Sequence, residues 1–254
     1  MRAERISNRL PFRIYVSVLL FSVIGTILQR TILPEPTILA PICSALMLLS
    51  GVAVLFRNIE VQTSISRAGL AVLALFLVGL TVELVGLYSK FPFGEYRYTG
   101  EWQPSVQIPG GLEFPLLLPV AWVLVVGAST LILPSPCPWR RSLLAAALAT
   151  AIDFFMEPTM IHILQYWTWP GHAGLYAPLT NAFGWFLTSL LGSLAFQTFA
   201  GKVVANQQTR WVLGGYLLFL AFLGFENLVP SIVLALLGAV CTSPQMLTLF
   251  RRVK

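Results

Sequence analysis

Charged side chains are scarce in this sequence. They make up 10% of its 254 residues, whereas soluble domains average about 25%. Apolar residues make up 57% of the chain, so a soluble domain would lack the polar side chains needed to cover its surface. The composition therefore excludes an ordinary soluble enzyme and predicts an integral membrane protein.

The residue types that hold metals and most cofactors are also rare. The chain has one aspartate and two histidines, His162 and His172, and its three cysteines form no CxxC pair. This inventory excludes the many-histidine boxes of membrane di-iron enzymes, axial haem ligation and paired Asp-rich magnesium motifs. Neither GxGxxG nor a P-loop occurs, which excludes the usual nucleotide sites. We expect no metal and no cofactor; a site made of both histidines and Glu157 is the one metal alternative.

Long apolar runs predict an all-α, polytopic helical bundle. A helix needs about 20 apolar residues to cross a bilayer. Such runs lie at 12–32, 37–56, 68–88, 115–133, 141–157, 179–199, 210–229 and 231–249. Seven spans are the alternative to eight, because Pro230 abuts the last run. Neither a repeat nor a low-complexity linker divides the chain, so residues 1–254 are expected to form a single transmembrane domain that retains its first span.

The basic residues predict an orientation. With the N-terminus in the cytoplasm, 13 of the 16 Lys and Arg residues lie on the inner side, and only Arg30, Lys90 and Arg97 lie outside. This bias predicts a multi-pass protein of the cell membrane with both termini inside. Because the basic residues lie in loops between spans, no nucleic-acid partner is expected. The long outer loops, 89–114 and 158–178, are the expected place of function.

Acidic residues gather on the opposite side. In this orientation eight of the ten acids lie in outer loops or at the outer ends of spans, the exceptions being Glu4 and Glu60. An ionisable group at membrane depth costs a few kcal/mol, so such groups need a partner or a function. The four concerned are Glu83, Asp153, Glu157 and Glu226. For Glu83 and Glu226, simple solvation at the interface is the alternative.

Asp153 and Glu157 form the most informative pair. Residues at i and i+4 share one helix face, and like charges at that spacing repel each other. Pro158 is expected to end the helix, which places both acids at the negative end of the helix dipole. These effects favour one protonated carboxyl near neutral pH, the condition for a general acid.

Aromatic residues surround this acid pair along the chain. They are either an interfacial aromatic belt or π faces that would stabilise a carbocation next to a proton donor. Asn181 and Trp185 are again i and i+4 and are expected to point towards the same region. The aromatic residues concerned are Tyr166, Trp167, Trp169, Tyr176 and Trp185.

Two stretches, 91–122 and 153–185, resemble a known family. They contain G-x-Y-x-Y-T at 94–99, P-L-x-x-P-x-A-W at 115–122 and P-L-x-N-x-x-G-W at 178–185, and together cover about a quarter of the chain. These elements resemble the membrane carotenoid 1,2-hydratases of the CruF type and the related bisanhydrobacterioruberin hydratases. The chain departs from the family pattern at Glu157-Pro158, where Asp-Pro is expected, and at Glu101, which follows Gly100.

The resemblance implies addition of water across the terminal C1=C2 double bond of an acyclic carotenoid, within the bilayer, giving a tertiary alcohol without a cofactor. Asp153 or Glu157 is then the expected proton donor, and Glu101 or Glu83 places the water. Asn181 and Tyr98 are expected as hydrogen-bond partners. The expected lining of the substrate site is Tyr96, Trp102, Trp122, Tyr166, Trp167, Trp169, Trp185 and Glu226. A cofactor-free terpene or carotenoid cyclase and a transporter are the alternatives.

Overall fold

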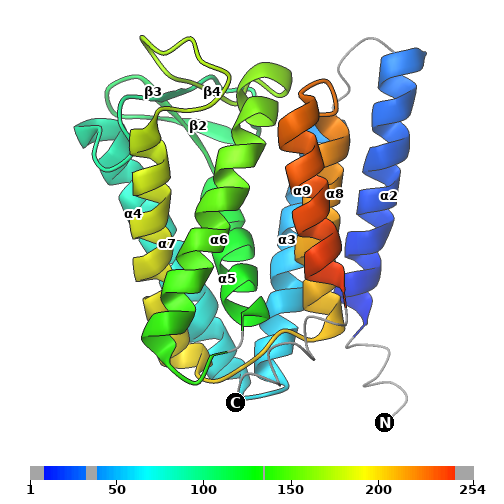
Figure 1. Cartoon of the computed structure of the whole chain (residues 1–254), viewed down its shortest axis with the longest axis vertical. Helices are drawn as coiled ribbons and strands as arrows, with labels where there is room; N and C mark the ends of the chain where they lie inside the picture. Colours follow the sequence, from blue (N-terminus) through cyan, green and yellow to red (C-terminus); the bar gives the residue numbers. More distant parts are fainter. Residues whose placement is uncertain (1–8, 33–38, 134, 244–254) are drawn as a thin grey trace.

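The computed structural model describes residues 9–32, 39–133 and 135–243, and within them the chain folds into a bundle of eight α-helices (Figure 1). Each helix corresponds to one of the predicted apolar runs, with ends that differ by a few residues. The helices are α2 (Leu10–Thr31), α3 (Leu39–Glu60), α4 (Ile65–Ser89), α5 (Leu118–Ile132), α6 (Pro138–Pro158), α7 (Leu179–Ala200), α8 (Gln207–Leu223) and α9 (Leu228–Thr242). The last helix, α9, begins three residues before the predicted span 231–249 and ends at Thr242, and residues 244–249 of that span lie outside the described residues.

Among the described residues, five helices are long and apolar enough to cross a membrane: α2, α3, α4, α6 with its extension to Ile163, and α7. The helices α5 and α9 are shorter apolar helices. Large apolar side chains cover the outer faces, as on α2, where Leu20 is 58% and Ile24 57% exposed. Such an exterior suits lipid rather than water. The helices therefore have the composition and surface of a membrane protein, while the number of spans stays a prediction.

Helix α5 forms the centre of the bundle. Nearly all of its residues are buried, and it packs against α3, α4, α6, α7 and α8. A helix that is apolar on all sides belongs in the interior. Figure 1 shows α4, α6 and α7 on one side and α2, α8 and α9 on the other.

The two predicted outer loops, 89–114 and 158–178, carry short strands, which the all-α prediction did not include. β1 (Arg97–Tyr98) pairs antiparallel with β4 (Trp167–Thr168), and β2 (Ser105–Ile108) pairs with β3 (Leu112–Pro115). In Figure 1 the labelled strands lie together at one end of the bundle. The first pair joins two loops that are far apart in sequence, because β1 follows α4 and β4 follows α6.

The prediction that Pro158 ends its helix is wrong. Helix α6 includes Pro158 and continues as a π-helix, η1 (Thr159–Ile163). A proline ring disturbs the turn that precedes it, and here the chain continues past the proline as one π turn. Asp153 and Glu157 therefore lie before the last helical turn, and the outer loop is shorter than expected.

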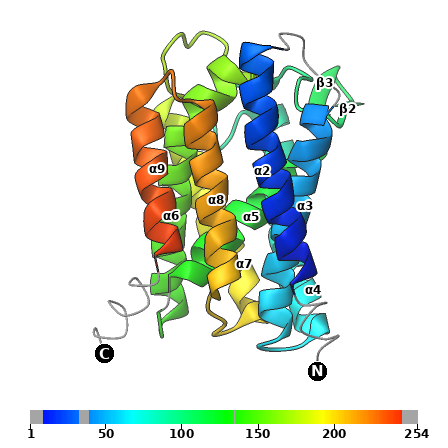
Figure 2. The ribbon, with the colours of Figure 1, turned by 90° about the vertical axis from the view of Figure 1, so that its right-hand side faces the viewer.

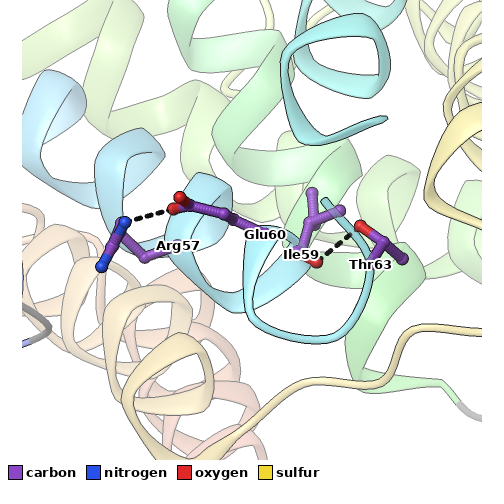
Figure 3. A network of polar contacts seen from close by, with 4 residues as sticks. All are labelled: Arg57, Ile59, Glu60 and Thr63. Carbon is purple, nitrogen blue, oxygen red and sulfur yellow. Dashed lines mark hydrogen bonds and ion pairs between the residues drawn. The ribbon is translucent and has the colours of Figure 1, made fainter. Parts of the chain in front are cut away.

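The start of α2 and the end of α9 lie at the same end of the bundle, opposite the strands (Figures 1 and 2). This is the arrangement that an even number of passes gives. The same end holds the C-terminus of α3, where Arg57 pairs with Glu60 and the Thr63 hydroxyl donates to the Ile59 carbonyl at 2.7 Å (Figure 3). Glu60 thus lies far from the strand end of the bundle. Which end of the bundle faces the cytoplasm stays a prediction.

Candidate active site

Two buried acids on α6 share one amide. Asp153 and Glu157 are only 1% and 2% exposed. The Asn181 amide nitrogen, at the start of α7, donates to Asp153 Oδ2 and to Glu157 Oε1, both at 2.9 Å. A neutral amide satisfies hydrogen bonds without supplying positive charge. The pair therefore has no counter-ion at this bridge.

The remaining oxygens of the two acids differ. Glu157 Oε2 accepts from the indole N–H of Trp167 at 3.0 Å and, more weakly, from that of Trp169 at 3.4 Å. Asp153 Oδ1 is buried and has no hydrogen-bond partner among the described residues. Glu157 is thus held through both of its carboxyl oxygens, and Asp153 through one of its two.

A third buried acid, Glu83 on α4, is 4% exposed. Its Oε2 accepts from the hydroxyls of Tyr96 at 2.8 Å and Tyr98 at 2.9 Å, and its Oε1 accepts from Trp122 Nε1 at 2.8 Å. Burial and the nearby Glu83 charge raise the pKa of both tyrosines well above the usual value. The tyrosines thus keep their protons and act as donors to this carboxyl.

The β1–β4 pair aligns the donors to Glu83 and Glu157. Tyr98 lies directly opposite Trp167 in the register of the strands. Tyr98 donates to Glu83, and Trp167 donates to Glu157. A two-residue ladder between distant loops therefore fixes donors to acids on two different helices.

A cavity of about 30 Å³ lies between these acids, and this space is large enough for a water molecule. Glu83 and Glu157 both line it, whereas Asp153 does not. The remaining lining residues are Phe93, Tyr96, Tyr98, Leu118, Trp167, Trp169, Asn181 and Trp185. The cavity thus joins two carboxyls from different helices with aromatic rings.

Aromatic rings form much of the site. Trp122 and Trp185 stack with ring centroids 3.9 Å apart, and Tyr96 lies 5.4 Å from Trp169. The negative face of an aromatic ring attracts a cation. Such walls suit a site in which positive charge develops on an otherwise apolar ligand.

Glycines on two helices make room for a wall residue that the sequence analysis did not single out, Phe93. A Cβ on Gly184 would lie 2.3 Å from its ring and a Cβ on Gly86 2.8 Å from it. Gly79 does the same for Trp122, since a Cβ there would lie 2.8 Å from the tryptophan side chain. Helical glycines one or two turns from predicted site residues are the signal that would have found this packing.

Several predicted site residues lie elsewhere. Glu101 and Glu226 are exposed and line neither cavity described here. Trp102 and Tyr166 stack on each other with centroids 5.1 Å apart, and of these two only Trp102 reaches a cavity, one next to the acid site. The other predicted residues meet at the strand end of the bundle; they are at positions 83, 96, 98, 122, 153, 157, 167, 169, 181 and 185.

The histidines lie apart from the acids in their contacts. A ring nitrogen of His162 lies 3.3 Å from the Leu175 carbonyl, and one of His172 lies 2.9 Å from the Tyr176 carbonyl. In the described part of the chain, no group of three His, Cys, Asp or Glu side chains is placed to hold a metal ion. His162, in η1, and His172 therefore both contact the backbone of the loop that follows η1.

Fold and site together define a helical protein of membrane type, with buried acids and aromatic rings around a small cavity at one end. The family model for carotenoid biosynthesis proteins matches residues 42–244, so the chain belongs to that family. It is similar to the bisanhydrobacterioruberin hydratase of Haloarcula japonica, with 30% identity over 188 residues, which are 68% of this chain. The match covers 62% of that relative's length, less than two thirds. No solved structure matches the chain.

Proposed function

We propose that this protein is a hydratase that adds water across the terminal C1=C2 double bond of an acyclic carotenoid end group and forms a tertiary alcohol. One observation carries the proposal: two buried carboxyls from different helices, Glu157 on α6 and Glu83 on α4, line the same aromatic cavity, which has room for water. Hydration of an alkene needs an acid, a site that tolerates a cation and a group that positions water. Membership of the carotenoid biosynthesis family supports the substrate class, and the relative named as a hydratase supports the reaction.

Glu157 is the proposed proton donor because it lines the cavity and Asp153 does not. Two buried carboxyls that share a neutral amide do not readily both ionise, so they hold a proton between them. Glu157 gives this proton to C2, the less substituted alkene carbon. Asp153, reached through Asn181, positions and supports the donor without touching the substrate.

Protonation at C2 leaves a tertiary cation at C1. The faces of Trp185 and Tyr96 stabilise this cation, and the Glu83 carboxylate adds the opposite charge. A water oxygen then bonds to C1 and passes one proton to Glu83. That proton returns to Glu157 through water in the shared cavity, so each turnover consumes one water and no net proton.

Isotope labelling tests the reaction. Purified protein in detergent or liposomes receives an acyclic carotenoid in heavy-oxygen, deuterated water, with neither metal nor nucleotide added. We expect an alcohol with the oxygen label on C1 and one deuterium on C2, and the same yield without molecular oxygen. Oxygen taken from the gas would instead indicate an oxidative hydroxylase. A deuterated, ring-closed hydrocarbon would indicate the cyclase, and an unchanged substrate would refute the proposal.

A further inference from the structure

A second cavity, of about 20 Å³, adjoins the acid site. It lies among α5, α6 with η1, and α8, and its walls include Ala121, Met156, Met160 and Tyr216. Three residues line both cavities: Leu118, Trp167 and Trp185. The two cavities are therefore neighbours that share part of their lining.

The second cavity contains no acid among its lining residues. Two indoles on its wall, Trp122 and Trp167, use their N–H groups for Glu83 and Glu157. Their rings therefore present carbon surface to this side. Glu83, Glu157, Tyr96 and Tyr98 line the first cavity. The second is walled mainly by aromatic rings, methionine and aliphatic side chains, and its polar groups include the Tyr216 hydroxyl and the Trp102 indole N–H, which has no hydrogen-bond partner among the described residues.

Helix α6 connects the two environments. Met156 precedes Glu157, and Met160 follows one turn after Met156 on the same helical face. A chain lying against these methionines would also meet Trp167 and Trp185, which line the acid cavity together with Glu157. Methionine side chains are flexible and polarisable, so they adapt to an inserted apolar ligand better than branched residues do.

We infer that the second cavity is the start of the binding slot for the polyene chain next to the reacting end group, with Ala121 controlling its width. This inference rests on the proposed function and names the side from which the substrate enters the acid site. The cavity of about 20 Å³ has room for a water molecule, so an isoprenoid chain enters it only as Met156 and Met160 move aside. Ala121, on α5, has the smallest side chain of the lining, so enlarging it narrows the slot without touching an acid.

The test compares two alanines on the same helix. Ala121 lines the slot, whereas Ala128 is also buried in the core and lines neither cavity. Ala121→Val and Ala128→Val add the same atoms to α5. Each variant is expressed with a long acyclic carotenoid, and the polyene retained after purification is measured by absorbance per protein. kcat/KM is then measured for the long carotenoid and for a short isoprenoid with the same terminal alkene.

We expect Ala121→Val to lower polyene retention and kcat/KM for the long substrate at least about tenfold, the scale on which a methylene-sized change acts in an apolar pocket. The short isoprenoid should change less than about twofold, and Ala128→Val should retain the polyene. If Ala121→Val does not fold, Met160→Ala replaces it. This substitution removes atoms from the opposite wall and should weaken retention of the long chain only.

The two proposals fail in different ways. Equal retention and equal kcat/KM in wild type and Ala121→Val would overturn the slot, even if the wild type makes the alcohol. Equal losses for long and short substrates would also overturn it. Retention that depends on Ala121 but yields no alcohol in the wild type would support the slot and refute the hydratase.

Discussion

Replacement of Glu157 by glutamine is the sharpest test of the acid site. Both oxygens of Glu157 accept N–H groups, from Asn181 on one side and from Trp167 and Trp169 on the other. A glutamine side chain has one oxygen, so it can accept a hydrogen bond on one of these sides only. On the other side its NH₂ group replaces an oxygen and faces an N–H donor. An unsatisfied buried group costs about 1–3 kcal/mol. The free energy of unfolding should therefore fall by no more than about 3 kcal/mol.

Turnover should change far more than stability. A general acid contributes about 10²–10⁴-fold to a rate, which corresponds to about 3–5 kcal/mol in the barrier. The assay follows formation of the tertiary alcohol from an acyclic carotenoid by chromatography and mass spectrometry. Glu113→Gln is the control, because Glu113 is also partly buried and accepts a hydrogen bond from Ser105 at 3.0 Å, but it lines neither cavity.

The neighbouring acid gives a contrast within the same variant series. In Asp153→Asn the amide oxygen keeps the bond from Asn181, and the NH₂ group occupies the place of Oδ1, which has no partner among the described residues. We expect a smaller loss of kcat than in Glu157→Gln and an unchanged KM. A Glu157→Gln protein that is inserted and turns over at the wild-type rate would refute the assignment of the donor.

Three further predictions concern the rest of the molecule. Glu83→Gln should lower kcat about 10²-fold, and Tyr98→Phe, which removes one donor to Glu83, should weaken activity less; the same alcohol assay measures both. Gly184→Ala should destabilise the protein by about 1–3 kcal/mol in thermal unfolding, because its Cβ would lie 2.3 Å from the Phe93 ring. The control is Gly69→Ala, which should be neutral or stabilising because no atom lies within 4 Å of its Cβ. In a variant without native cysteines, His172→Cys should react with an impermeant label from outside and Gln207→Cys should not; the reverse pattern would overturn the orientation.

The helices were predictable because hydropathy over about 20 residues is a strong signal. Their ends were less so. Pro158 reads as a helix end in sequence, yet the chain continues for five residues as a π-helix, because packing compensates for a local preference. The i, i+4 spacing of Asp153 and Glu157 was sufficient to place them on one face, and the same spacing oriented Asn181 and Trp185.

The loops were not predictable in the same way. Glu101 and Tyr98 are three residues apart, and both were expected near the reacting carbon. In the structure Tyr98 lies in β1 opposite Trp167 and reaches Glu83, whereas Glu101 lies beyond the strand and is exposed. A strand of two residues leaves no periodic signal in the sequence, so a pairing between positions 98 and 167 is visible only in three dimensions.

This pairing explains why the site needs both outer loops at once. Helices α4 and α6 carry the acids, but neither helix supplies the donors that hold them. Trp122 on α5 and Asn181 on α7 donate to them, and the other four donors come from the loops: Tyr96 and Tyr98 in or next to β1, and Trp167 and Trp169 in or next to β4. Buried carboxyls without such partners would be costly at membrane depth. The loops therefore stabilise the acids that the helices place, and the cavity exists where the two sets of donors meet.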